Sequence, residues 1–159
     1  MSPFSNLNVL DMSANFAGSY CGRLLSGFGA SVKKIIIEGR EDRSSSYGPF
    51  LNEKLDPKSS AMFHYMNHNK QVVSISKDDE RIHELLLSAD LLIEDFSNED
   101  LRTIGLDMSN IRGLNPYILI CSLAPFGKNT KWEERSWSDL TIQALTGMCS
   151  VNGEQGKPP

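Results

Sequence analysis

The stretch Ser31-Val32-Lys33-Lys34-Ile35-Ile36-Ile37 decides the fold, because it closes on three consecutive apolar, β-branched residues. β-Branched side chains favour strands. A strand that is apolar on both sides is typical of a sheet buried on both faces, and such sheets are mostly parallel. The stretch therefore predicts a strand over Val32 to Ile37 in an α/β fold.

Short apolar runs and amphipathic stretches alternate on both sides of this strand. Further strands are expected over 7–11, 71–75, 91–94 and 117–121. Helices are expected over 17–28, around 82–86, over 98–104, over 107–114, and from Ser138 or Asp139 through Leu145. The alternation predicts a mostly parallel sheet with helices on both faces, joined by right-handed crossovers.

The first predicted helix has a clear apolar pattern. Tyr20, Leu24, Leu25 and Phe28 recur at a spacing that places them on one face. This spacing is typical of an amphipathic helix whose apolar face packs on a core.

The loops that follow the strands are the candidate ligand-binding segments, because ligands of open parallel sheets bind beyond the carboxyl ends of the strands. These loops are residues 11–18, 38–43, 76–78, 95–98 and 122–127. Small residues after the first strand allow a phosphate to approach backbone N–H groups. The pair Gly18 and Glu38 weakly resembles a dinucleotide-binding arrangement, although the Gly-x-Gly-x-x-Gly pattern is absent.

Composition limits the class of protein. The chain has 159 residues, which fits one domain or the first part of a larger one. Its net charge of −4 argues against a domain that grips nucleic acid or an anionic membrane. No signal-peptide pattern is visible, and the cysteines Cys21, Cys121 and Cys149 fit neither a disulfide framework nor a zinc site. We therefore expect a cytoplasmic protein whose cysteines are small buried apolar residues.

The segment 39–60 interrupts the alternation of strands and helices. It is polar, and it contains Pro49 and Pro57. Loops of this length inside a compact domain are usually functional or disordered. We expect a flexible segment here.

Two patterns further along have an ordinary structural explanation. His64 and His68 are four residues apart, but no third ligand is evident and no metal site is predicted. Trp132 and Trp137 flank a charged stretch, where they either stack on an adenine or a partner or pack the loop onto the domain.

Short motifs recur in order along nearly the whole chain. They are Val9–Ser13 with Ala17-Gly18, Leu24-Leu25 with Phe28–Ile35, Met66–Gln71, Ala89–Phe96, Leu101–Leu106, Asn115–Leu119 with Cys121-Ser122, Phe126-Gly127, Ser138–Leu140 and Gly153–Pro159. Together they resemble the class III CoA-transferases, the family of formyl-CoA transferase, carnitine CoA-transferase and α-methylacyl-CoA racemase.

The resemblance implies a Rossmann-like, CoA-binding α/β domain over 1–159 that forms the N-terminal part of a larger interlocked fold. Family members are longer than this chain, so it looks like a fragment or a truncated relative. The family's interlocked homodimers imply a homodimer or a partner subunit for the full-length form. Coenzyme A or an acyl-CoA is the implied ligand.

The resemblance also implies nucleophilic catalysis by a carboxylate. In the family an aspartate attacks the acyl-CoA thioester, and CoA returns to give an aspartyl-CoA intermediate that reacts with the acceptor acid. That aspartate is expected just beyond Pro159. In the match, Asp139 corresponds to a carboxylate position near the active site, which implies an accessory role for it. The histidine of the racemase branch falls on Ser138, which disfavours racemisation.

The implied CoA contacts come from the loops after the strands and from the third motif. They are Ala17, Gly18, Arg40, Arg43, Asn69, Lys70, Asp95 and Phe96. Lys70 and one of the two arginines are expected to hold the phosphates as exposed charges. Asp95 replaces the family's asparagine and is expected to oppose an anion.

The chain departs from the family pattern at other contact positions. Ala14 and Phe16 replace a histidine and a glutamine, Gly39 replaces an arginine, and Ser97-Asn98 replaces an Arg-Pro pair. Three functions stay open: a CoA-transferase region, a non-catalytic relative that binds CoA or a partner, and a nucleotide-binding oxidoreductase domain.

Overall fold

A computed structural model describes residues 2–51, 56, 59–153 and 157. The chain divides into two compact units, Met1–Leu123 and Ala124–Pro159. The sheet and both of its helical layers belong to the first unit.

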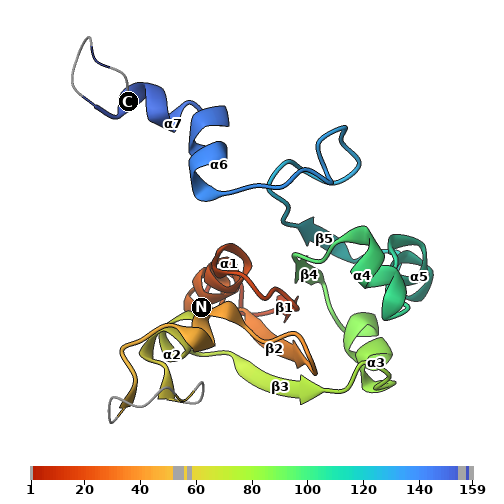
Figure 1. Ribbon diagram of the computed structural model, residues 1–159. Coiled ribbons are helices and arrows are strands. Elements are labelled where there is room, and N and C mark those ends of the chain that lie inside the picture. The colour runs from red at the N-terminus through yellow and green to blue at the C-terminus, as the bar shows by residue number, and fades with distance from the viewer. Residues whose placement is uncertain (1, 52–55, 57–58, 154–156, 158–159) are drawn as a thin grey trace. The chain divides into compact units, whose positions relative to one another are not determined.

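The first unit is built on a five-stranded parallel sheet (Figure 1). Its strands are β1 (Asn8–Asp11), β2 (Ser31–Ile37), β3 (Gln71–Ile75), β4 (Leu91–Glu94) and β5 (Leu119–Ser122). Their spatial order is β3-β2-β1-β4-β5, and every neighbouring pair is parallel. The α/β class with a parallel sheet is therefore confirmed.

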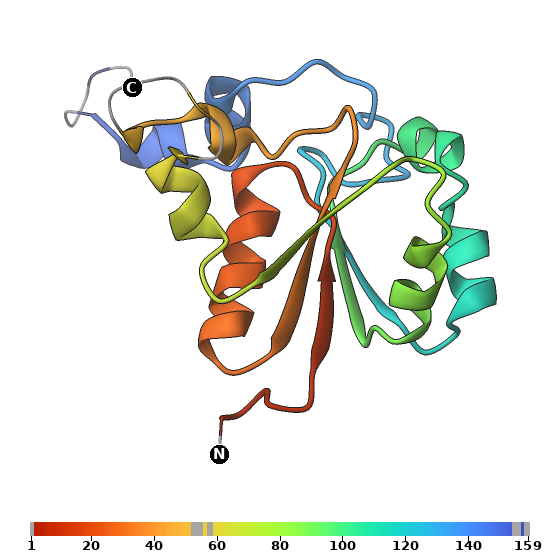
Figure 2. The same ribbon diagram turned by 90° about the horizontal axis from the view of Figure 1, so that it is seen from below.

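Helices cover both faces of this sheet, as Figure 2 shows from below. One face carries α1 (Phe16–Gly27) and α2 (Ala61–Met66), with the 3-10 helix η1 (Arg43–Ser46) beside α2. The other carries α3 (Arg81–Leu87), α4 (Asn98–Thr103) and α5 (Met108–Leu114). Consecutive side chains of a strand point to opposite faces, so each strand contributes to both layers.

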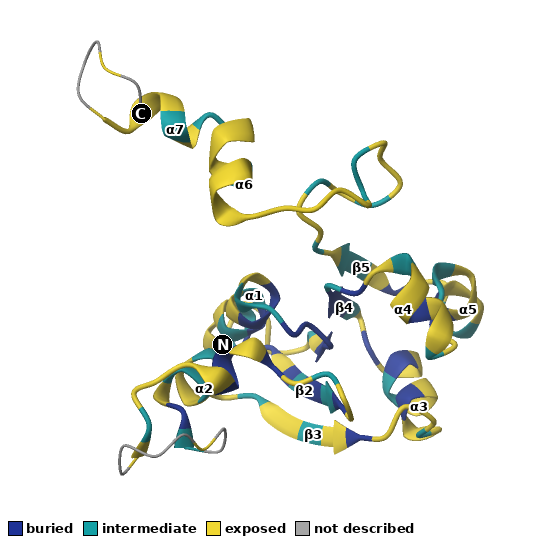
Figure 3. Ribbon diagram, viewed as in Figure 1, coloured by how far each residue is buried: buried dark blue, intermediate teal, exposed yellow. Residues whose placement is uncertain are grey.

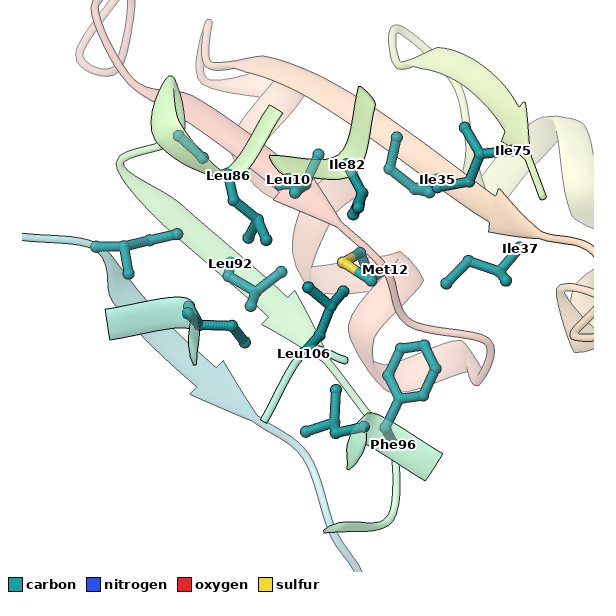
Figure 4. Packing of buried hydrophobic residues seen from close by; sticks show 14 residues of the cluster. Leu10, Met12, Ile35, Ile37, Ile75, Ile82, Leu86, Leu92, Phe96 and Leu106 are labelled. Atoms are coloured by element: carbon teal, nitrogen blue, oxygen red, sulfur yellow. The ribbon is translucent and has the colours of Figure 1, made fainter. Parts of the chain in front are cut away.

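The larger apolar core lies under α3, α4 and α5 (Figure 4). Its buried members come from four strands, three helices and the adjoining loops, and include Leu10, Met12, Ile35, Ile37, Ile75, Ile82, Leu86, Leu92, Phe96, Leu101, Leu106, Ile111 and Ile118. The opposite face holds a smaller cluster of Val9, Ala30, Val32 and Ile93. Apolar burial at about 25 cal/mol per Å² makes the first cluster the main source of stability.

Helix α1 packs on the sheet with its small residues, which corrects the expected orientation. Gly18, Ser19, Gly22 and Ser26 are buried, whereas Tyr20, Leu24 and Phe28 are 42%, 43% and 53% exposed. Only Leu25 of the expected apolar face contributes to the smaller cluster. The glycines permit this close approach: a Cβ atom on Gly18 would lie 2.3 Å from the Cβ of Ser13.

Several described residues of the segment 39–60 are buried and hydrogen-bonded within the first unit, whereas we expected a flexible loop. Asp42, Ser44, Ser45 and Ser60 are buried. The Ser60 hydroxyl donates to the carbonyl oxygen of Ser44 at 2.8 Å, and it accepts the N–H of Phe63 to cap α2. Residues 52–55 and 57–58 lie outside the described residues.

The second unit contains α6 (Asp139–Leu145) and α7 (Met148–Val151). None of its described residues is buried (Figure 3). Ser138 is the N-cap of α6: its hydroxyl accepts the N–H of Thr141, and the Thr141 hydroxyl accepts the N–H of Ser138. Asp139 is therefore the first residue of the helix and not its cap. Trp132 packs edge-on against Phe126 inside the preceding loop, with ring centroids 6.0 Å apart.

None of the helices among the described residues is both long and apolar enough to cross a membrane. The three cysteines are free and half-buried rather than fully buried. Burial is also what raises the pKa of the Cys21 thiol most strongly.

Candidate ligand-binding site

The strand order reverses between β1 and β4, and this position brings together the loops that follow three strands. The chain runs outward from β1 to β2 and β3 on one side, and from β4 to β5 on the other. In open parallel sheets, the crevice at such a switch point is the usual ligand site. The loops after β1, β2 and β4 meet here through Asn15, Arg40 and Asp95.

The carboxylate of Asp95 lies at the centre of these contacts. It accepts the backbone N–H of Ala14 at 2.9 Å and that of Asn15 at 2.7 Å. The Asn15 side-chain amide donates to it at 2.8 Å, and Arg40 Nη2 donates at 2.7 Å. Only 4% of the Asp95 side chain is exposed. We call these four residues, Ala14, Asn15, Arg40 and Asp95, the Asp95 site.

Arg40 is held in the Asp95 site by three separate contacts. Besides its ion pair, Nη2 donates to the main-chain oxygen of Asp95 at 3.0 Å. Its guanidinium stacks on the ring of Phe96, 3.6 Å from the centroid, a favourable cation–π geometry. Its other terminal nitrogen, Nη1, is buried and has no hydrogen-bond partner among the described residues.

Arg43 places a second positive charge beside the Asp95 site, on the side that faces solvent. It is exposed, and its Nη1 donates to the side-chain oxygen of Asn15 at 3.2 Å. This contact orients the Asn15 amide so that its nitrogen faces Asp95.

A second group of charges lies behind the Asp95 site, between the sheet and α1. It consists of Asp11, Lys34, Asp42 and Lys70, which we call the buried charge cluster. Asp11 and Lys34 are directly paired residues of β1 and β2, and their side chains point to the face that α1 covers. The side chains of all four residues are at most 1% exposed.

Each cation of the cluster contacts a carboxylate and a backbone oxygen. Lys34 Nζ lies 2.9 Å from Asp42 Oδ2 and 3.5 Å from Asp11 Oδ1, and it also donates to the main-chain oxygen of Ser13. Lys70 Nζ lies 2.7 Å from Asp11 Oδ2 and 2.7 Å from the main-chain oxygen of Ser19. Two cations and two anions thus neutralise one another, as buried charges require.

Two members of the buried charge cluster, Lys70 and Asp42, have shifted pKa values. Desolvation lowers the pKa of Lys70, and the attraction of Asp11 offsets only part of that effect. For Asp42, desolvation alone would raise the pKa, but the charge of Lys34 and the hydrogen bonds from Ser44 outweigh it and lower the pKa. Asp42 is thereby held as an anion beside Lys34.

Gly22 allows α1 to lie directly over the cluster. A Cβ atom at this position would be 2.8 Å from Asp11 Oδ2 and 3.2 Å from Lys70 Nζ. Any larger residue would displace the ion pair between Asp11 and Lys70. The small face of α1 therefore shields the cluster from water.

The structure places the residues expected at the site in different environments. Arg40, Asp95 and Phe96 meet directly, and Arg43 reaches them through Asn15. Ala17 and Gly18 lie in the first turn of α1, one exposed and one buried. Asn69 is exposed in a left-handed backbone conformation, with φ of 62°. Asp139 belongs to the second unit.

Lys70 is not an exposed loop charge, contrary to the sequence expectation. Its side chain is fully buried, and three acceptors surround its ammonium group. Asp95 is likewise not a free negative charge, because it already holds four donors. Both residues are occupied by internal partners.

Sequence reasoning did not identify the roles of Asp11, Lys34 and Asp42. One available signal was Lys34 itself, a cation inside a strand that is otherwise predicted to be buried. A second was Asp11 at the end of an apolar strand. Because Asp42 reaches Lys34 from a breaker-rich loop, no periodic pattern indicated that contact.

Comparison with known proteins decides the family. The sequence matches CoA-transferase family III over residues 4–159. The chain belongs to this family. Residues Ala14, Asn15, Arg40 and Asp95 all fall within the matched range.

Among the curated relatives of the chain are two proteins named as CoA-transferases. The chain is 30% identical over 163 residues to succinate–glutarate CoA-transferase of Agrobacterium fabrum, covering 99% of this chain and 41% of the relative. It is 28% identical to succinyl-CoA:glutarate CoA-transferase of Mus musculus, covering 36% of that relative. The chain thus spans about two fifths of the length of these relatives.

A solved structure shares the fold. A CAIB/BAIF family protein from Brucella suis superposes with a TM-score of 0.84 and 28% identity. The match covers 99% of this chain and 43% of that protein. CoA transfer is therefore supported at the level of the family.

Proposed function

We propose that this chain is the CoA-binding part of a CoA-transferase that moves CoA from a thioester to a carboxylic acid. The observation that carries the proposal is the match to CoA-transferase family III along nearly the whole chain. The relatives named above act on succinate and glutarate. A dicarboxylic acid is accordingly our proposed substrate class.

The switch point between β1 and β4 is the proposed CoA-binding edge. Arg43 is exposed there, and Arg40 lies behind it with a buried nitrogen that lacks a partner among the described residues. Arginine is well suited to phosphate because its planar fork binds two oxygens at once. Because Lys70 is buried in an ion pair, we assign the phosphate contacts to the arginines alone.

The chemistry that we propose for the complete protein proceeds through a carboxylate nucleophile. An aspartate beyond Pro159 attacks the thioester carbonyl and expels the CoA thiolate, which leaves an aspartyl anhydride. The thiolate then attacks the aspartyl carbonyl of the anhydride, which gives aspartyl-CoA and releases the donor acid. The acceptor carboxylate attacks in turn and leaves as its CoA ester after a second exchange.

The reaction needs groups that we place outside residues 1–159, and we also propose a cytoplasmic homodimer for the complete form. A non-catalytic relative that binds CoA or a partner remains the second candidate. The occupied state of Asp95 favours the partner-binding form of this candidate, because that carboxylate already holds donors that an incoming phosphate would need. The family match favours either candidate over an oxidoreductase domain.

A CoA-transfer assay distinguishes these candidates. Residues 1–159 and a form extended beyond Pro159 are each incubated with succinyl-CoA and glutarate, and glutaryl-CoA is followed by mass spectrometry. We expect product only from a protein that continues beyond Pro159 with a Gly-Asp pair. No product from such a protein would support the non-catalytic candidate. Turnover by residues 1–159 that is lost in Asp139→Ala would instead identify Asp139 as the nucleophile.

A further inference from the structure

We propose that the Asp95 carboxylate is the built-in occupant of an oxyanion-binding site, and that the vacated site takes a small carboxylate or a phosphate. The site lies at the proposed CoA-binding edge, but the inference does not depend on CoA. It rests on what surrounds a single side chain.

The groups around the Asp95 carboxylate are all hydrogen-bond donors. Its oxygen Oδ2 receives the N–H of Asn15 at 2.7 Å and the Asn15 side-chain amide at 2.8 Å. Its oxygen Oδ1 receives the N–H of Ala14 at 2.9 Å and Arg40 Nη2 at 2.7 Å. These lengths are typical of charge-assisted bonds. Any oxyanion of similar size satisfies the same four donors.

The Asp95 carboxylate binds only one of the two terminal nitrogens of Arg40. A guanidinium and an oxyanion commonly form two parallel bonds through two nitrogens. Here Nη2 is satisfied, while the buried Nη1 has no partner among the described residues. The carboxylate of Asp95 is tethered to the residue that follows β4, and in this position it contacts only Nη2. A free oxyanion carries no such tether.

The donors have contacts that do not involve the carboxylate. Arg40 also donates to the main-chain oxygen of Asp95 at 3.0 Å and stacks on Phe96. The Asn15 side chain also accepts a hydrogen bond from Arg43 at 3.2 Å. We therefore expect removal of the carboxylate to leave a preorganised site rather than a collapsed loop.

Anion-dependent thermal unfolding tests the proposal. Asp95→Ala removes a group the size of formate, so formate, inorganic phosphate and chloride are compared at equal ionic strength. We expect formate or phosphate to raise the melting temperature of Asp95→Ala well above its value in chloride, and to shift that of the wild-type chain much less. The double variant Asp95→Ala, Arg40→Gln should lose most of this shift.

The two anions identify the ligand chemistry. A larger shift with phosphate would indicate that a further oxygen reaches Arg40 Nη1, whereas a shift with formate alone would define a carboxylate site. No anion-specific shift in Asp95→Ala, or an equal shift in the wild-type chain, would overturn the proposal.

A second measurement covers the case in which Asp95→Ala is unfolded in chloride. Circular dichroism should then show refolding in formate or phosphate, and failure to refold in either anion counts against the proposal. Asp95→Asn fills the site with a neutral amide and should gain no anion response. Because no arm contains CoA, failure here leaves the proposed function standing, and loss of CoA binding leaves this proposal standing.

Discussion

At the scale of single residues, Lys34 has the most unusual environment for its type. Lysine is almost never fully buried unless it is paired, and Lys34 is 0% exposed between β2 and α1. Asp11 and Asp42 supply the two countercharges, and Ser13 and Ser19 supply neutral acceptors. The residue thereby ties the first strand to the loop that carries Arg40 and Arg43.

Substitution of Asp11 tests this electrostatic balance. Asp11→Asn leaves Lys34 and Lys70 with one carboxylate between them. Breaking a buried pair in this way typically costs about 3–5 kcal/mol. We expect a loss of that size in urea unfolding. Asp79→Asn, which removes a surface partner of Arg81, is the matched control and should unfold like the wild-type chain.

Asp42 should produce an acid-dependent loss of stability. Its pKa is lower in the folded chain than in the unfolded chain. Stability is complete above the unfolded pKa, about 3.9. As pH falls below that value, the unfolded chain takes up a proton that the folded chain does not, so stability decreases until the folded pKa is passed. Urea midpoints of Asp42→Asn should fall less steeply than those of the wild-type chain over this range; parallel curves would show that Asp42 is not responsible.

At the scale of elements, sequence patterns predict strands better than helix orientation. The continuous apolar run in β2 and the capping residue Asp107 of α5 each had a local physical signal. The orientation of α1 had no such signal, because its buried face is defined by what lies beneath it. Gly22 faces an ion pair formed by Asp11 and Lys70, residues 59 positions apart. Periodicity within one helix cannot reveal such a contact.

The cap of α6 provides a test at this scale. Loss of a serine N-cap costs about 0.5–2 kcal/mol of helix stability. Ser138→Ala should therefore accelerate amide hydrogen exchange at Thr141 and Ile142, whose N–H groups bond to Ser138. Asp139→Ala keeps the cap and should change these two rates much less. Equal acceleration in both variants would contradict the assignment of Ser138 as the cap.

At the scale of the whole molecule, sequence patterns predicted which loops lie at one edge of the sheet, but not how the charged side chains there are paired. The alternation of strands and helices predicts that the loops after β1, β2 and β4 meet, and they do so at the Asp95 site. Sequence motifs also led to the family. Charge type alone could not show that Lys70 is buried or that Asp95 is already paired, because both facts depend on long-range contacts.

Calorimetric titration of CoA into the purified chain tests the central claim, that this edge binds CoA through its arginines. We expect binding that weakens with added salt, because exposed charges are screened. Arg43→Ala should weaken it roughly ten- to hundredfold, given about 1.5–3 kcal/mol for a hydrogen bond to a charged group. Arg112→Ala, an exposed arginine in the last turn of α5, should bind like the wild-type chain. No CoA binding, or unchanged affinity in both Arg43→Ala and Arg40→Ala, would contradict the claim.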